Sequence, residues 1–273
     1  MHLFAIADPH LSKAQPKPMD IFGGNWQRHP DIFFERWRET VEADDVVLIP
    51  GDISWAIRLD DALLDLDDIA ALPGHKILLR GNHDYWWSSI GKVRRALPDG
   101  MWALQNDAFV ISVLPAGDNS LNQVHITNTV QDIPKVRDAT HILIAGTRGW
   151  DCPGSGQFDE DDPHDAKVYA REQQRLELSL AHAQKLHQAL PSLTSKLVVM
   201  MHYPPTHLRE DVQLDPSGFM EILACHSPDV LVFGHLHGYS PAEMPADIFV
   251  ELAGTRVYLV AADALGFYPK HIL

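Results

Sequence analysis

Short runs of apolar residues recur along the whole chain, and they constrain its fold more than any other feature of the sequence. Each run holds only four or five residues, which suits a strand better than a helix. Because most of the runs consist mainly of Val, Ile and Leu, we expect strands that are covered on both faces. The runs are Leu3–Ala7, Val46–Ile49, Lys76–Leu79, Val110–Val113, Val124–Thr127, His141–Ala145, Leu197–Met201, Val230–Phe233 and Val257–Val260.

Between these runs lie segments with the residue spacing of amphipathic helices. The clearest begins at Asp162-Pro163, where an N-cap residue precedes a proline at the first helical position, and it ends at Pro191. Strands that alternate with helices indicate an α/β fold. Because the sequence has no repeat and no long linker, we expect a single domain over residues 1–273. The other predicted helices are Asp31 to about Asp44, Asp60–Leu72 and Ser217–His226.

Five polar motifs each follow one of the apolar runs directly. In open α/β sheets, ligands bind beyond the carboxyl ends of the strands, so five such ends in neighbouring strands would gather these side chains in one place. Glycines in three of the motifs would let the backbone turn sharply there. The motifs are Asp8-Pro9-His10, Gly51-Asp52, Gly81-Asn82-His83-Asp84, His202 and Gly234-His235-Leu236-His237.

The residue types in these motifs are those of a metal site. Asp8 and His10 are two residues apart, so in an extended chain they would point the same way and could bind one ion. His235 and His237 share this spacing. A mixture of carboxylate and imidazole ligands suits Mn, Fe, Zn, Co or Ni better than Ca or Mg. Each motif alone is commonplace, and it is the ordered set of five that indicates a metal centre.

Charge and hydropathy narrow the choice of partner. The formal net charge is −15, whereas a duplex-binding surface is normally basic, so nucleic-acid partners are disfavoured. No apolar run approaches the ~20 residues that cross a bilayer, and the first motif leaves no room for a secretory leader. Two cysteines are too few for a disulfide framework. We therefore expect a cytoplasmic protein without a membrane partner, and the sequence leaves its oligomeric state open.

At the five motifs the sequence resembles the calcineurin-like metallophosphoesterases, whose pattern is D-x-H, G-D, G-N-H-D/E, a histidine and G-H-x-H. All five blocks are intact between Asp8 and His237. The stretches Pro50–Trp55, Gly81–Trp87 and Gly146–Trp150 are similar to a bacterial branch of predicted phosphohydrolases. The fold that the resemblance implies is a two-sheet β-sandwich flanked by helices, with four layers in the order α/β/β/α.

The resemblance also implies a role for each motif residue. Two divalent transition-metal ions, with manganese favoured, would be bound in the centre and bridged by Asp52. His83 would be the general acid, oriented by Asp84. The first ion would be bound by Asp8, His10 and His237, and the second by Asn82, His202 and His235.

The implied activity is hydrolysis of a phosphoester through attack by a hydroxide that bridges the two ions. His83 would then protonate the departing alkoxide. A small phosphomonoester and a small phosphodiester fit equally well, so both a phosphatase and a phosphodiesterase remain open. The alternatives in other classes are a non-catalytic metal-binding scaffold and a sensor that holds a phosphorylated ligand without turnover.

Residues outside the ligand set have alternative interpretations. Arg80 and Arg148 each follow a strand and could bind a substrate phosphate, although a surface or packing role is commoner for such arginines. Trp55 and three other tryptophans near the motifs could stack an aromatic leaving group or pack in the core. Ser12–Pro30 and Thr147–Asp161 lack periodicity and are the candidates for loops that cover the site.

Overall fold

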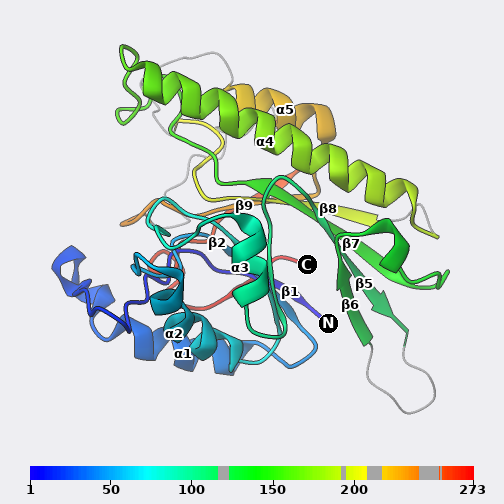
Figure 1. The fold of residues 1–273 in the computed structure, drawn as a ribbon, viewed down its shortest axis with the longest axis horizontal. Coiled ribbons are helices and arrows are strands. Elements are labelled where there is room, and N and C mark those ends of the chain that lie inside the picture. The colour runs from blue at the N-terminus through cyan, green and yellow to red at the C-terminus, as the bar shows by residue number, and fades with distance from the viewer. Residues whose placement is uncertain (116–122, 192–194, 208–216, 240–251, 253) are drawn as a thin grey trace. The chain divides into compact units, whose positions relative to one another are not determined.

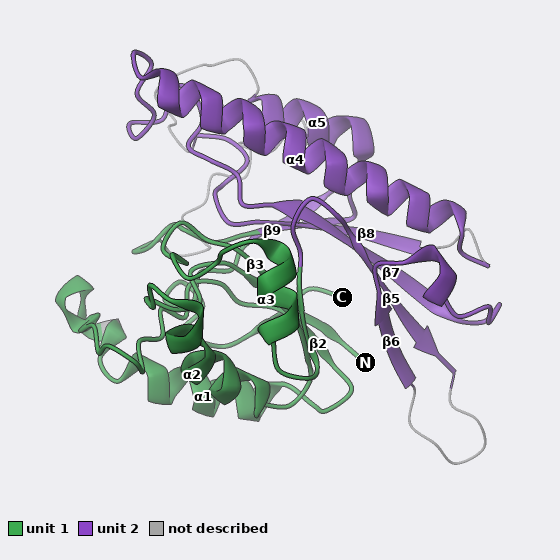
Figure 2. Cartoon of the chain, in the orientation of Figure 1, with its two compact units in different colours: residues 1–103, 233–242, 259–273 green, residues 104–232, 243–258 purple. Residues whose placement is uncertain are grey.

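The computed structural model describes residues 1–115, 123–191, 195–207, 217–239, 252 and 254–273. Within these residues the chain forms two mixed β-sheets and five α-helices (Figure 1). The predicted α/β class with two sheets and flanking helices is confirmed. The chain divides into two compact units (Figure 2): unit 1 holds residues 1–103, 233–242 and 259–273, and unit 2 holds residues 104–232 and 243–258.

Unit 1 is built on a five-stranded sheet with the strand order β11-β1-β2-β3-β4. Strands β1 to β4 run parallel to one another, and β11 pairs antiparallel with β1. The carboxyl ends of β1, β2 and β3 therefore lie at the same edge of the sheet, and the first three polar motifs begin there. The strands are β1 (Leu3–Ala5), β2 (Val46–Pro50), β3 (His75–Leu79), β4 (Met101–Ala103) and β11 (Lys270–His271).

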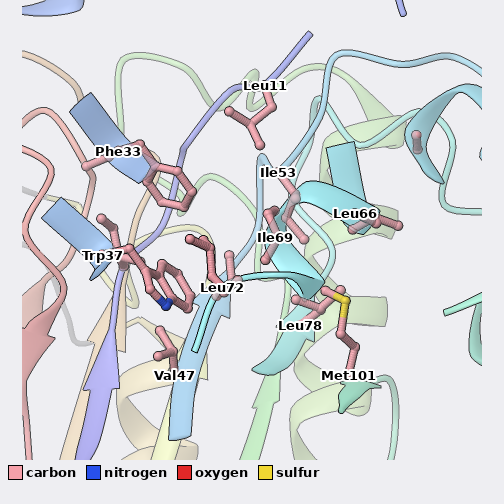
Figure 3. Close-up of a cluster of buried hydrophobic side chains, with 14 of the residues drawn as sticks. Leu11, Phe33, Trp37, Val47, Ile53, Leu66, Ile69, Leu72, Leu78 and Met101 are labelled. Atoms are coloured by element: carbon pink, nitrogen blue, oxygen red, sulfur yellow. The ribbon is translucent and has the colours of Figure 1, made fainter. Parts of the chain in front are cut away.

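Helices α1 (His29–Thr40) and α2 (Leu59–Ala70) supply much of the hydrophobic core of unit 1, and a short helix, α3 (Ile90–Ala96), follows β3. The buried side chains of α1 and α2 gather with those of the parallel strands in one cluster (Figure 3). This cluster fixes the strands whose ends carry the motifs. Its labelled members include Phe33, Trp37, Val47, Leu66, Ile69, Leu78 and Met101.

A lysine lies within this apolar surrounding. Lys76 in β3 is only 2% exposed, and its ammonium donates hydrogen bonds to the carbonyl oxygens of Ala70 and Leu72 at the end of α2. The ammonium also lies 6.0 Å from the ring centre of Trp37. Burial lowers the pKa of Lys76 from 10.5 to about 8, because the apolar surrounding disfavours the charged form.

This buried lysine predicts a pH dependence of stability. Between pH 8 and 10.5 the unfolded chain binds more protons at Lys76 than the folded chain does, so the free energy of unfolding rises with pH. We expect Lys76→Met to remove a rise of about 2 kcal/mol between about pH 7 and about pH 9.5. Urea unfolding of both proteins at the two pH values gives the difference in their free energies of unfolding. Groups that titrate alike in both proteins do not contribute to the change of this difference with pH. A stability gap that is the same at both pH values would contradict the prediction.

Unit 2 is built on the second sheet, with the strand order β10-β9-β8-β7-β5-β6. Strand β7 pairs parallel with β8 and antiparallel with β5, and β5 pairs antiparallel with β6. Helix α4 (Pro163–Gln188) packs against β7, β5 and α5 (Gly218–His226). The strands are β5 (Phe109–Leu114), β6 (Gln123–Thr127), β7 (Thr140–Thr147), β8 (Ser195–Met201), β9 (Val230–Phe233) and β10 (Arg256–Leu259).

The start of α4 agrees with the sequence prediction. Asp162 is the N-cap residue, and its side chain accepts a hydrogen bond of 2.8 Å from the backbone N–H of His164, while Pro163 is the first helical residue. At 26 residues α4 is the longest of the described helices. Neither α4 nor any other helix in the described part of the chain combines the length and apolar composition needed to cross a bilayer.

The five motif-bearing strands do not all belong to one sheet, so the expectation of five neighbouring strand ends is wrong in that form. Strands β1, β2 and β3 are neighbours in the first sheet, and β8 and β9 are neighbours in the second. The chain after β9 returns to unit 1, and it carries His235 and His237 with it. Unit 1 therefore holds four of the five motifs, and His202 belongs to unit 2.

Candidate metal centre

The first two motifs of unit 1 run side by side just beyond β1 and β2. The backbone N–H of Asp8 donates to the carbonyl of Gly51 at 3.0 Å, and that of His10 donates to the carbonyl of Asp52 at 3.1 Å. The same ladder continues from Leu11 to Ile53. Asp8 is 0% exposed and Asp52 is 1% exposed. Two carboxylates thus lie in neighbouring buried segments.

Four candidate ligands have backbone torsions that residues other than glycine rarely adopt. The φ angle is 58° at Asp8, 47° at His10, 52° at Asp52 and 69° at His235. Each such residue costs roughly 1–3 kcal/mol and persists only where the surrounding structure enforces it. The backbone at Asp8 and His10 is therefore not extended, as their spacing had suggested, although the two side chains do present ligand atoms to the same place. Left-handed turns of the backbone, rather than a strand-like zigzag, set the directions of these side chains.

Two motif glycines are required because the backbone approaches a carboxylate closely. A Cβ atom on Gly81 would overlap the side chain and the backbone nitrogen of Asp52. A Cβ atom on Gly234 would overlap a carboxylate oxygen of Asp8 and the side chain of Ala7. Only glycine fits at these positions without displacing Asp8 or Asp52, which explains why these motifs contain it.

Asp8, His10 and His237 come together as the resemblance implied. One carboxylate oxygen of Asp8 and one ring nitrogen from each histidine all lie within 4.8 Å of one another. The two Nε2 atoms of His10 and His237 are 3.1 Å apart. Two nitrogens bound to one ion at about 2.1 Å lie roughly 3.0–3.4 Å apart. The donor set and its spacing therefore fit a divalent ion.

Asn82 and His235 form a second pair. Nδ1 of His235 lies 3.2 Å from Oδ1 of Asn82, and the backbone N–H of His235 donates to the Asp8 carboxylate at 2.9 Å. The two histidines of the last motif thus separate, with His237 beside His10 and His235 beside Asn82. The resemblance likewise assigned His237 and His235 to different ions.

Burial disfavours the ionised form of the carboxylates in this centre. Burial raises the pKa of Asp8 well above its usual value, and the charge of Asp52 raises it further against the opposing effect of His237. Burial also raises the pKa of Asp52, although His83 acts in the other direction. Divalent cations supply the positive charge that would let both groups ionise, so the electrostatics agree with the donor set.

His83 lies beside Asp52 but is more open to solvent. Its backbone N–H donates to Oδ1 of Asp52 at 2.8 Å, and its Nε2 lies 3.9 Å from Oδ2 of the same residue. The side chain of His83 is 34% exposed, so the ring is accessible to a small molecule. Burial is the main reason that the pKa of His83 is lowered, and the nearby ammonium of Lys17 adds to that effect, while Asp52 opposes it.

Asp84 acts on the backbone rather than on the ring of His83. Its fully buried carboxylate accepts hydrogen bonds from the backbone N–H groups of Ile53, Ser54 and Gly81 at 2.8–3.1 Å. It also accepts one from the indole N–H of Trp86 at 2.9 Å. Burial, followed by repulsion from Asp52, raises the pKa of Asp84 to about 7. Asp84 therefore ties the second and third motifs together, and any orienting effect on His83 passes through the backbone.

Aromatic side chains form the wall of the centre. Trp55 stacks on His10 with 5.0 Å between ring centres, and its ring centre lies 4.3 Å from that of His83. The buried Trp26 contacts His10 and His237 edge to face at 5.9 and 5.4 Å. The ammonium of Lys17 lies 3.1 Å from the ring centre of Trp55. Residues of the predicted covering segment 12–30 thus line the centre in unit 1.

Three predicted site residues remain to be placed, namely His202, Arg148 and Arg80. His202 follows β8 in unit 2 and is fully buried. Arg148 follows β7 in the same unit, lies 3.6 Å from the buried carboxylate of Glu172 and packs over Trp150. Arg80 is half-buried directly after β3 in unit 1. Their roles as ligand and phosphate-binding residues stay predictions, as does the role of 147–161 as a covering segment.

Sequence reasoning missed one residue of the centre. Asp263 lies next to His237, with Oδ1 of Asp263 3.0 Å from Nδ1 of the ring. It is 26 positions from His237 and belongs to no motif, so only the tertiary fold brings it there. The only signal in the sequence was that Asp263 follows the apolar run Val257–Val260.

Comparisons with known proteins identify the family of the chain. The family model for calcineurin-like phosphoesterases matches residues 1–239, whereas a comparison with curated proteins gives no match. Among solved structures, the chain is similar to phosphopantetheinyl hydrolase from Mycobacterium tuberculosis, at 14% identity and a TM-score of 0.47, over 100% of this chain and 95% of that one. It is also similar to a protein of unknown function from Aquifex aeolicus, at 14% identity and a TM-score of 0.40, over 98% of this chain and 94% of that one. Because the family match covers most of the sequence and all five motifs, the chain belongs to the calcineurin-like phosphoesterase family.

Proposed function

We propose that the chain is a phosphohydrolase that uses two divalent ions, with manganese favoured, to cleave a small phosphomonoester or phosphodiester. The observation that supports this most is the convergence of Asp8, His10 and His237 beside the buried carboxylate of Asp52. Bound ions would lower the pKa of a water molecule and neutralise the charge that develops on the phosphoryl oxygens. In this proposal His202 joins Asn82 and His235 as a ligand of the second ion.

The charges of the centre favour an anionic substrate. Two divalent ions beside the carboxylates of Asp8 and Asp52 would leave the centre net positive, although the whole chain has a formal net charge of −15. A small phosphoester would be attracted to this local charge, whereas an extended nucleic acid would meet a mainly acidic surface. We therefore propose a small molecule as the substrate. We also propose a cytoplasmic setting, because the two cysteines are too few for a disulfide framework.

His83 is placed to act on the leaving group. Its ring is partly exposed beside Asp52 and contacts Trp55 and Tyr85, and the hydroxyl oxygen of Tyr85 lies 3.3 Å from Nδ1. A protonated imidazole in this position can donate a proton to the oxygen of a departing alkoxide. Trp55 would limit access of water to the same place.

This role predicts that His83→Ala affects substrates unequally. For an alkyl phosphate, whose leaving group needs a proton, kcat should fall by about 10²–10⁴. For para-nitrophenyl phosphate, whose leaving group departs as a stable anion, the loss should be less than about tenfold. Steady-state kinetics on both substrates, with metal content measured by elemental analysis, tests the prediction.

The matched control is His271→Ala, which removes an exposed imidazole from β11 in the same unit. It should leave both rates unchanged. Equal losses on the two substrates, or loss of bound metal in His83→Ala, would show that His83 is not the general acid.

The function itself is tested by hydrolysis of para-nitrophenyl phosphate and bis-para-nitrophenyl phosphate, with added Mn²⁺ and with chelator. We expect turnover of at least one substrate with Mn²⁺ and none with chelator. The ratio of the two rates distinguishes a phosphatase from a phosphodiesterase. If the protein binds metal and hydrolyses neither substrate, the result favours a scaffold or a sensor of a phosphorylated ligand.

A further inference from the structure

The segment that follows β10 runs along the first motif of unit 1. The backbone N–H of Ala7 donates to the carbonyl of Val260 at 2.7 Å, and the N–H of Ala262 donates to the carbonyl of Ala7 at 2.9 Å. Asp263 is the next residue, so this pairing places it near Asp8. The family match ends at residue 239, and Asp263 therefore lies outside the part of the chain that the match covers.

Both oxygens of the Asp263 carboxylate are directed at the last motif. Oδ1 lies 3.0 Å from Nδ1 of His237, and Oδ2 accepts the backbone N–H of Gly238 at 2.9 Å. The side chain of Asp263 is only 2% exposed. A carboxylate that grips the ring and the adjacent backbone together restricts both the position and the rotation of the imidazole.

This contact also determines which nitrogen of His237 is available. A carboxylate only accepts hydrogen bonds, so Nδ1 of His237 must carry the proton. Nε2 then keeps its lone pair, and this is the atom that lies 3.1 Å from Nε2 of His10. The lone pair of His237 is thus directed at the place where Asp8 and His10 also present ligand atoms.

Aromatic packing also restrains the ring of His237. Trp26 lies edge to face against His237 at 5.4 Å, and Phe267 packs edge to face on Trp26 at 5.5 Å. Phe267 belongs to the same turn as Asp263, since its N–H donates to the carbonyl of Ala262 at 2.7 Å. The turn at residues 262–267 therefore fixes His237 by a hydrogen bond on one side and, through Trp26, by packing on another.

We propose that Asp263 is a positioning residue that holds His237 in the tautomer and orientation needed to bind a divalent ion. This inference rests on one part of the proposed function, namely that the centre binds metal, and it does not require hydrolysis. Carboxylates that orient a metal-binding histidine typically contribute 10–100-fold to metal affinity. Asp263 would act on the metal through His237, without touching the substrate.

The test compares Asp263→Asn with the wild-type protein in its metal-free form. The asparagine has the same shape, but its amide oxygen can replace only one of the two acceptors, and its NH₂ group would face the other donor. Calorimetric titration with Mn²⁺ should show a Kd for one site that is about 10–100-fold higher. At saturating Mn²⁺, kcat should return to within about threefold of wild type, because the substrate contacts are unchanged.

Asp45 provides a matched control in the same unit. It is 1% exposed, its Oδ1 lies 3.2 Å from Nδ1 of His2 and its Oδ2 accepts the backbone N–H of Glu42 at 2.9 Å, so it makes the same kinds of contact away from the ligands. Asp45→Asn should change the melting temperature but leave the Mn²⁺ affinity within about twofold of wild type. Asp263→Asn should change the affinity by far more.

An unchanged Mn²⁺ affinity in Asp263→Asn would overturn the proposal, and so would affinities that fall equally in the two variants. Should Asp263→Asn fail to fold, Asp263→Glu, which keeps the carboxylate, replaces it in the same titration and should bind Mn²⁺ more weakly than wild type. The calorimetric titration measures metal binding independently of turnover. A protein that binds Mn²⁺ but hydrolyses no substrate would therefore refute the proposed function, and the titration would still test the role of Asp263.

Discussion

Replacing Asp52 with asparagine is expected to lower kcat/KM of the Mn²⁺-dependent reaction by a factor on the order of 10³ or more, equivalent to about 4 kcal/mol of transition-state stabilisation. Oδ1 of Asp52 accepts the N–H of His83, and Oδ2 lies 3.7 Å from Nε2 of His10. The carboxylate thus stands between the proposed ligands and the proposed acid. Asparagine removes its negative charge and would direct an NH₂ group at a cation.

The same substitution should not weaken the metal-free protein. Because burial raises the pKa of Asp52, a neutral amide at this position avoids the cost of a buried charge. We expect the melting temperature of metal-free Asp52→Asn to equal or exceed that of wild type, whereas the increase caused by added Mn²⁺ should disappear. Activity measured with calorimetric melting checks both statements. A variant that loses activity only because it unfolds would contradict this account.

Replacing Asp84 with alanine is expected to lower the free energy of unfolding by about 4 kcal/mol. The substitution leaves three backbone N–H groups and the indole N–H of Trp86 without their acceptor in a fully buried place. Each unpaired buried donor costs about 1–3 kcal/mol, and relief of the buried charge, shown by the raised pKa of Asp84, offsets part of the total. Urea unfolding of the metal-free protein measures the loss.

Asp84→Asn separates the hydrogen bonds from the charge. Its amide oxygen can still accept from Ile53, Ser54 and Trp86, which share Oδ1, but its NH₂ group would face the N–H of Gly81. We expect a smaller loss of about 1–2 kcal/mol. If the alanine and asparagine variants were equally stable, Asp84 would not be the link between the second and third motifs.

Most of the fold could be predicted from the sequence because most of its strands are buried and mainly apolar. Every predicted strand is present, within a few residues of its expected bounds. The strands and the α-helix that were missed have little apolar periodicity: β4 has three residues, β11 is the polar pair Lys270–His271, and α3 is a seven-residue helix with two arginines. Short elements of this kind depend on tertiary contacts, which local patterns do not record.

The centre was predicted through its residue types and order, but not through its geometry. The spacing of Asp8 and His10 suggested an extended pair, whereas both residues have positive φ angles. An aspartate or a histidine in the sequence does not predict a positive φ angle, because the surrounding tertiary structure stabilises this conformation. Asp263 was missed for a related reason, because its contact with His237 depends on the pairing of 260–262 with Ala7.

The most direct test of the central claim is a titration of metal-free protein with Mn²⁺ in which bound metal per chain and hydrolysis of an aryl phosphate are measured in the same samples. The account predicts that turnover rises as two ions bind per chain and that chelator abolishes this turnover. It also predicts that Asp52→Asn fails to bind two ions and has no turnover. Full turnover in metal-free protein, or turnover that does not depend on bound metal, would contradict the account.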